Sequence, residues 1–160
     1  MKITILCVGK IKEKFYVDAI KEYSKRLSRY AKLDIIEVAD EKTAEQASDR
    51  EIEIVKEKEG KRLLSSIKDD GFVVCLAING KSLDSVELSK YLDNLKIKGV
   101  SHIYFVIGGS LGLSDEVLKR SDMKLSFSRM TFPHQLMRVI LLEQIYRSFR
   151  ISNNEPYHKC

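Results

Sequence analysis

The chain has 160 residues, of which 44% are hydrophobic and 32% charged, and its net charge is +5 at pH 7. This length predicts one domain with a substantial core, and the composition excludes a disordered chain. The apolar run that starts at Ile3 is too short for a secretion signal or a membrane span, so we expect a cytoplasmic protein. Cys7, Cys75 and Cys160 share no metal-binding spacing, and we expect neither a disulfide framework nor a metal site.

The positive charge is concentrated in two segments. Residues 10–32 contain eight lysines and arginines against three acids, and residues 129–160 contain five against two. Two basic segments in an otherwise balanced chain fit a polyanionic partner, because neutralisation of phosphates favours such binding. A solvated lysine-rich helix face explains the same counts and is the more common case.

Strand-like and helix-like patterns alternate along the chain. Apolar, β-branched runs predict five strands, at residues 3–8, 33–38, 72–78, 102–107 and 123–128. Apolar stripes and capping residues predict helices over residues 15–27, from Ser48 to about Ile67, from Asp84 or Ser85 to about Leu95, after Ser114, and from Pro133 to about Arg150. This alternation predicts an α/β fold with a mostly parallel five-stranded sheet flanked by helices.

The last predicted helix is apolar around most of its circumference. Its apolar residues are Leu136, Met137, Val139, Ile140, Leu141, Leu142, Ile145, Tyr146 and Phe149. A helix of this kind must be buried nearly all round, and the sheet can cover only one side. A second copy of the chain is the simplest cover for the other side, so we expect a homodimer.

Three strand ends carry small or flexible residues, at 76–80, 107–112 and 126–131. The second, with glycines at 108, 109 and 112, is neither a Walker loop nor a GxGxxG fingerprint, and a tight turn explains its glycines nearly as well. Asn79-Gly80 is a strong turn signal. Because the ends of parallel strands open at one edge of a sheet, the three segments together outline one cleft.

Three stretches together resemble the SPOUT superfamily of methyltransferases. They are VIGGSLGL at 106–113, LSFSRMTFPHQLMRVILLEQIYRSFRI at 125–151 and EPYHK at 155–159, and the similarity extends over essentially the whole chain. The smallest members, which they resemble most specifically, methylate N3 of a pseudouridine in 23S rRNA. The resemblance implies one domain over 1–160 with a substrate-binding tail from about 152, a deep trefoil knot, an obligate homodimer and S-adenosylmethionine as cofactor.

The resemblance also implies roles for single residues. The tail of one subunit would reach the cofactor pocket of the other, where Tyr157 and His158 help to bind the target nucleotide. Arg138 is a further catalytic candidate because of its own chemistry, as a fixed cation on the last helix. The residues that match the cofactor contacts of the family are Leu76, Gly108, Gly109, Phe127, Ser128, Arg129, Met130, Thr131 and Phe132.

Methylation of an imide nitrogen needs loss of its proton, so a base of near-neutral pKa or a fixed cation is expected, and no metal is required. His134 and Arg138 lie one helical turn apart. Alternatively, His134 bonds backbone at the helix start and Arg138 forms a structural ion pair, with Glu143 or with an acid of a second subunit. The tail is alternatively disordered, although an aromatic and a histidine beside a lysine suit a stacked base and its phosphate.

The expected partner is 23S rRNA within the assembled ribosome, with no membrane partner. A different function remains open: a non-catalytic RNA- or ribosome-binding protein with the same fold, which would not bind the cofactor. A nucleotide-binding α/β enzyme such as a phosphotransferase is disfavoured, because the sequence has no P-loop lysine and no aspartate-rich magnesium site.

Overall fold

The fold was analysed in a computed structural model that describes residues 1–159. Strands and helices alternate without exception along the chain, as the sequence predicts. The elements are β1 (Lys2–Val8), α1 (Lys14–Leu27), β2 (Lys32–Val38), α2 (Asp49–Ser65), β3 (Phe72–Ser82), α3 (Ser85–Ile97), β4 (His102–Ile107), α4 (Asp115–Arg120), β5 (Met123–Ser126) and α5 (His134–Ser152).

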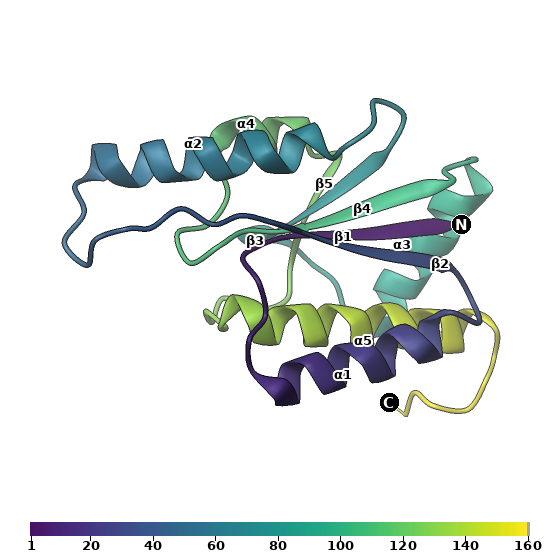
Figure 1. The fold of residues 1–160 in the computed structure, drawn as a ribbon. Helices are drawn as coiled ribbons and strands as arrows, with labels where there is room; N and C mark the ends of the chain where they lie inside the picture. The colour runs from purple at the N-terminus through teal and green to yellow at the C-terminus, as the bar shows by residue number, and fades with distance from the viewer. Residues whose placement is uncertain (160) are drawn as a thin grey trace.

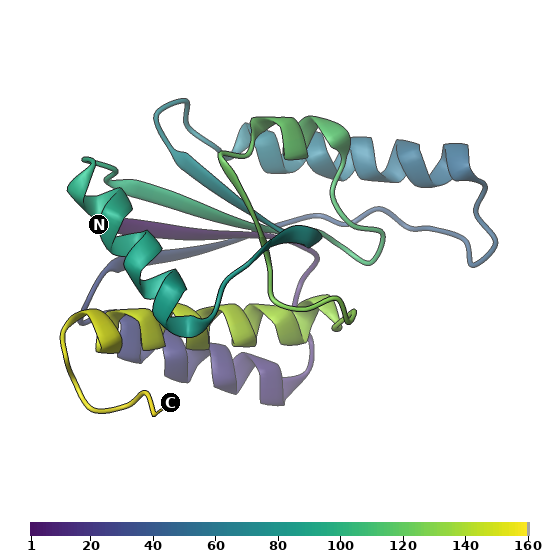
Figure 2. The same ribbon diagram turned by 180° about the vertical axis from the view of Figure 1, so that it is seen from behind.

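The five strands form one sheet in the order β2-β1-β4-β3-β5, and all four ladders are parallel. The predicted α/β class is therefore confirmed. Because the strands run in one direction, their carboxyl ends share one edge of the sheet (Figure 1). Helices α1 and α5 both begin at this edge, in this view and in the reverse view of Figure 2.

Helices cover both faces of the sheet. Figures 1 and 2 show α1, α3 and α5 on one face and α2 with α4 on the other. Each face of the sheet has its own hydrophobic core, and alternate residues of β1 belong to one or the other. Ile3 and Ile5 pack with α1, α3 and α5, whereas Leu6 and Val8 pack with α2 and α4. Burial on both faces explains why the central strands are nearly continuous apolar runs.

Side-chain caps fix the starts of three helices as predicted. Ser48 with Glu51 and Asp84 with Glu87 form capping boxes at α2 and α3, and Ser114 accepts a hydrogen bond from the Val117 amide at α4. Pro133 precedes the first residue of α5, His134.

The predicted turn at Asn79-Gly80 is wrong, because β3 continues through it to Ser82. Leu76 and Lys81 both lie opposite Leu125, so residues 77–80 leave the ladder as an irregular excursion. A Cβ at Gly80 would lie 2.8 Å from the Lys124 backbone, which explains the glycine. The last strand, β5, ends at Ser126 rather than at 128, because its partner strand ends opposite it.

None of the helices within residues 1–159 has the length and apolarity needed to cross a membrane. Over the same residues, no group of three or more His, Cys, Asp or Glu side chains is arranged to hold a metal ion. Cys7 and Cys75 are free thiols, and burial raises the pKa of each to about 11, so neither is a reactive thiolate at neutral pH. Cys160 lies outside the described residues.

Candidate active site

A cavity of about 670 Å³ opens beyond the carboxyl ends of β4 and β5 and beside the irregular part of β3. Three segments form most of its wall: 76–78, 107–113 and 127–134, with Met137 of α5 added. The volume is in the range of small-molecule and cofactor sites. The cleft predicted from three flexible strand ends is therefore present, and its first wall is shorter than expected because only residues 76–78 of that end reach it.

The glycine segment forms a tight turn at the cavity wall. Gly112 has φ +90°, its amide donates to the Gly109 carbonyl at 3.0 Å, and a Cβ on Gly108 would lie 2.8 Å from the Gly112 backbone. The interpretation of these glycines as a tight turn is therefore confirmed, and the same segment lines the cavity. The turn needs glycine, and the absence of side chains leaves its backbone facing the cavity.

The segment between β5 and α5 turns without a glycine, because serine side chains stabilise it. The Ser126 hydroxyl donates to the Ser128 carbonyl at 3.2 Å, and the Ser128 hydroxyl accepts from the Met130 amide at 2.9 Å. Pro133, with φ −53°, then leads directly into α5. These contacts give the wall a defined shape against which a ligand can bind.

Eight of the nine residues predicted to contact the cofactor line this cavity. They are Leu76, Gly108, Gly109, Phe127, Ser128, Met130, Thr131 and Phe132. The ninth, Arg129, is exposed to solvent and is not part of the lining. The cavity also includes His134 and Met137, which the sequence did not place among the cofactor contacts.

Glu59 of α2 is a site residue that sequence reasoning missed. Its side chain is 5% exposed, and one carboxylate oxygen accepts from the Glu41 amide at 3.0 Å. A Cβ at Gly109 would lie 3.2 Å from the other oxygen, so Glu59 packs directly behind the glycine turn. Burial raises the pKa of this carboxyl. The sequence contained one indication of this: Glu59 is four residues from both Val55 and Leu63, so it lies on the apolar face of the helix.

Arg138 does not point into the cavity. The side chain is 1% exposed, donates to Glu37 at 2.6 Å and to the carbonyls of Val8 and Gly9 at 2.9 and 2.7 Å. The alternative of a structural ion pair therefore describes Arg138, with Glu37 of its own chain as the partner rather than Glu143 or an acid of a second subunit. Its guanidinium fixes the ends of β1 and β2 beneath the start of α5.

His134 is the titratable side chain on the cavity wall. Burial lowers the pKa of its imidazole, and the nearby Arg138 guanidinium lowers it further. The ring is therefore neutral at pH 7 and has a nitrogen that can accept a proton. No hydrogen bond from this ring to another part of residues 1–159 is present, so the alternative of a backbone-bonding histidine finds no partner there.

The tail packs on α5 of its own chain. Tyr157 donates to Glu143 at 2.7 Å and stands edge-on to Tyr146, while His158 lies 3.1 Å from Arg147. Burial raises the pKa of Tyr157 to about 12, and the hydrogen bond to Glu143 adds to this. Glu143 follows His134 by nine residues, or about 13 Å of helix, so Tyr157 and His158 do not line the cavity of their own chain.

Solved structures of other proteins share this architecture. The protein resembles a probable methylase family protein from Haemophilus influenzae Rd KW20, with a TM-score of 0.53, 11% identity, and coverage of 99% of this chain and 70% of that one. It also resembles the putative methyltransferase Lpg2936 from Legionella pneumophila, solved with its bound cofactor SAM (TM-score 0.50, 10% identity, 93% and 66% coverage). At these identities the likeness shows the fold alone.

Sequence comparison identifies the family. The model described as "Predicted SPOUT methyltransferase" matches residues 1–158, so the chain belongs to the SPOUT methyltransferase family and is a methyltransferase. It is 60% identical to the ribosomal RNA large subunit methyltransferase H of Clostridium botulinum (strain Alaska E43) and 65% to the putative enzyme of that name from Methanococcus maripaludis (strain C5). Each alignment covers 99% of this chain and 100% of the relative.

Proposed function

We propose that the protein methylates 23S rRNA of the large ribosomal subunit, at N3 of a pseudouridine, and that its substrate is the assembled ribosome in the cytoplasm. One observation carries this proposal: relatives named for large-subunit rRNA methylation align over their whole length, and the residues matching the family's cofactor contacts surround one cavity. The chain acts as one domain over 1–160 with a C-terminal tail.

The methyl donor that follows from membership in the SPOUT family is S-adenosylmethionine, whose sulfonium supplies an activated methyl group. The cavity fits this group in volume and in lining. Leu76 and Phe127 offer apolar walls, the turn at Gly108 offers close backbone approach, and the 128–132 segment offers backbone donors and acceptors. The chain's own task is to hold the donor, orient the nucleotide and exclude water.

His134 is the residue best placed to receive the N3 proton, because it lies on the cavity wall with a neutral ring. Tyr157 and His158 would bind the target nucleotide, with Arg147 stacked over Tyr157 at 4.6 Å as a nearby cation. We assign Arg138 a positioning role, since it fixes the strand ends beneath the start of α5.

We propose that two chains form the working enzyme. Leu136, Val139 and Ile140 are partly exposed and belong to neither core, and Phe15 of α1 is 66% exposed. Two copies of α5 could pack antiparallel with Val139 and Ile140 at the centre of the contact. Position 143 of one chain would then lie opposite position 136 of the other, and position 147 opposite position 132. The tail of each chain would then reach the cavity of the other.

We also propose that the C-terminal segment passes through a loop of the preceding chain to form a deep trefoil knot. Stretching single molecules by their termini tests this topology. A knotted chain should extend to less than the length of 160 free residues, about 3.3–3.6 Å per residue. An extension at the full length would reject the knot.

Transfer of labelled methyl from S-adenosylmethionine tests the activity. The acceptors are ribosomes from cells that lack this gene and, in parallel, naked 23S rRNA. Label on a pseudouridine of intact ribosomes is the expected result. Label on naked RNA alone would overturn the ribosome as substrate, and no label with no cofactor binding by calorimetry would favour the non-catalytic RNA-binding protein.

Mixing two inactive variants tests the shared site. One variant lacks residues from Pro156 onward, and the other carries Gly108→Val, which distorts the glycine turn of the cavity wall. After mixed refolding, a site built from two chains should regain about a quarter of wild-type activity, because half of the dimers then contain one complete site. If each chain uses its own tail, the mixture should stay inactive.

A further inference from the structure

Residues 10–32 are the segment with the largest excess of positive charge. Residues 10–32 carry eight basic and three acidic residues, a balance of +5 that equals the charge of the whole chain. The arginines of α5 are held in ion pairs: Arg138 with Glu37, Arg147 with Glu143 and Arg150 with Glu155. The surface around α1 therefore carries the largest excess of cationic charge.

Helix α1 has two chemically different flanks. On the flank toward α5, Arg26 lies over the rings of Tyr23 and Tyr146 and pairs with Glu22. Lysines form a stripe elsewhere on the helix, since positions 14, 21 and 25 fall on one face. Of these, Lys14 pairs with Asp18. Lys21 and Lys25 are exposed, and no acidic partner for either is found within residues 1–159.

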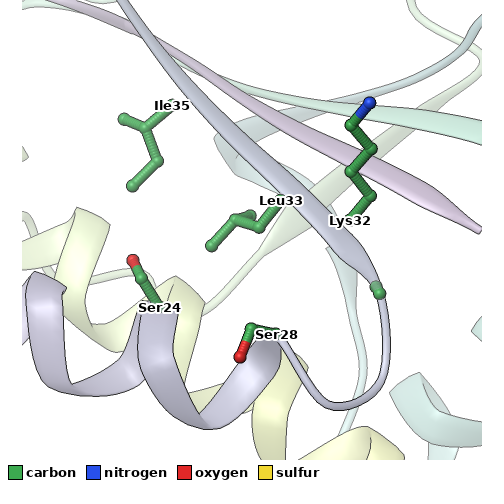
Figure 3. A pocket seen from close by; sticks show the side chains of 6 residues that line it. Ser24, Ser28, Lys32, Leu33 and Ile35 are labelled. Atoms are coloured by element: carbon green, nitrogen blue, oxygen red, sulfur yellow. The ribbon is translucent and has the colours of Figure 1, made fainter.

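A groove of about 620 Å³ runs beside this stripe, between α1 and the edge strand β2 (Figure 3). Leu33 and Ile35 provide its apolar strand side, and Ser24 and Ser28 provide hydroxyls from the helix. Figure 3 shows the Ser24 hydroxyl pointing from α1 toward β2, whereas the Lys32 side chain points to the far side of the strand. The groove therefore joins an apolar side to hydroxyl donors and nearby ammonium groups.

We propose that this flank of α1 binds the sugar–phosphate backbone of the substrate rRNA, with Lys21 and Lys25 on phosphates and the Ser24 hydroxyl as an added donor. This inference rests on the proposed rRNA substrate. Lysine ammonium groups and serine hydroxyls are ordinary partners of phosphate oxygens. A surface of unpaired lysines without a buried aromatic anchor suits a polyanion better than a protein partner.

The stripe leads away from the cavity in a continuous line. Lys14 and Lys25 are eleven residues apart, or about 16 Å along the helix. The segment before Lys14 is anchored near the start of α5, whose residue His134 lines the cavity, because Glu37 accepts from the Ile11 amide at 3.1 Å and also pairs with Arg138 of α5. RNA held along α1 would thus continue toward the nucleotide in the active site, and this surface supplies affinity outside the chemistry.

The test is the double variant Lys21→Gln/Lys25→Gln, which removes two charges and leaves the cavity intact. For ribosomes as substrate, we expect KM to rise and the slope of log KM against log salt to fall by about 1.4–1.8, or 0.7–0.9 for each lost contact. The maximal rate and the cofactor Kd should not change. Lys90→Gln/Lys98→Gln, two exposed lysines of the α3 region, is the matched control and should behave as wild type.

An unchanged KM and salt slope in the α1 double variant would overturn the proposal, as would an equal effect of the control. A lower affinity for rRNA-free ribosomal proteins, with unchanged affinity for rRNA, would instead identify a protein-binding surface and reject it. Direct binding to labelled ribosomes separates this question from catalysis. If wild type binds ribosomes through α1 but transfers no methyl group, the docking surface stands and the proposed activity fails.

Discussion

At the scale of single residues, buried polar groups give the site its shape. Arg138 was expected at the chemistry because it shares a helix face with His134. The structure instead buries it among carbonyl groups at the ends of β1 and β2, with Glu37 as counter-ion. No spacing in the sequence can show this, because Glu37 and Arg138 are 101 residues apart.

Removal of Arg138 alone should destabilise the protein. Arg138→Met removes the donor to the buried ends of β1, the Val8 and Gly9 carbonyls, and the counter-ion of Glu37, which is itself exposed. Loss of such charged hydrogen bonds costs about 1.5–3 kcal/mol. Urea unfolding of the variant measures the loss. The double variant Arg138→Met/Glu37→Leu should recover part of it, because no charge is then left unpaired; a double variant less stable than both single ones would contradict this account.

Tyr157 should make the stability of the packed tail depend on pH. Its pKa is raised from 10.0 to about 12, so the folded state favours the neutral phenol. The stability it contributes is present in full below pH 10 and is lost as the pH rises toward 12. Ultraviolet titration of wild type minus Tyr157→Phe should show a phenol that ionises near pH 12. A difference curve centred at pH 10 would mean that the tail does not hold Tyr157 against Glu143.

At the scale of elements, periodicity and capping were sufficient to predict all ten helices and strands. Ser48 and Asp84 identify helix starts through local chemistry, and continuous apolar runs identify strands buried on both faces. The failure at 77–80 has a different origin. Asn-Gly favours a turn locally, but Gly80 is needed there for close approach to the Lys124 backbone of another strand.

The position of the cavity could be predicted from the sequence, because parallel strands end at one edge of the sheet. The residues behind its glycine turn could not be predicted in this way. Glu59 reaches the glycine turn only through the packing of α2, in which Gly60 also comes into close contact with Ser114. The segments that line a site are easier to identify from a sequence than the helix that packs behind them. For the same reason, the sequence does not show where Tyr157 and His158 lie relative to the cavity of a second chain.

The glycine turn should tolerate no side chain at position 108. Gly108→Ala places a Cβ 2.8 Å from the Gly112 backbone, and such overpacking costs about 1–3 kcal/mol. If this cost falls on the cofactor-binding conformation of the turn, cofactor affinity should fall about 5- to 150-fold. Calorimetric titration with S-adenosylmethionine measures this. Gly99→Ala is the control: its φ of +89° makes alanine destabilising there, yet cofactor affinity should stay unchanged.

At the scale of the whole molecule, the uncovered side of α5 should decide the oligomeric state. Ile140→Glu would place a charge in the proposed interface, where its desolvation is unfavourable, so sedimentation equilibrium should detect monomers and methyl transfer should be lost. Ile97→Glu changes a residue that is 81% exposed and should leave both properties intact. A dimeric Ile140→Glu variant would place the interface elsewhere.

The strand order β2-β1-β4-β3-β5 also has a consequence for synthesis of the chain. Lys2 pairs with His102, so β1 gains its inner neighbour only when residue 102 and those after it have left the ribosomal exit tunnel. At about 5–20 residues per second, the apolar strand β1 waits several seconds with only β2 beside it. The nascent chain therefore has a long interval in which chaperones can bind it, and its core closes only near the end of translation.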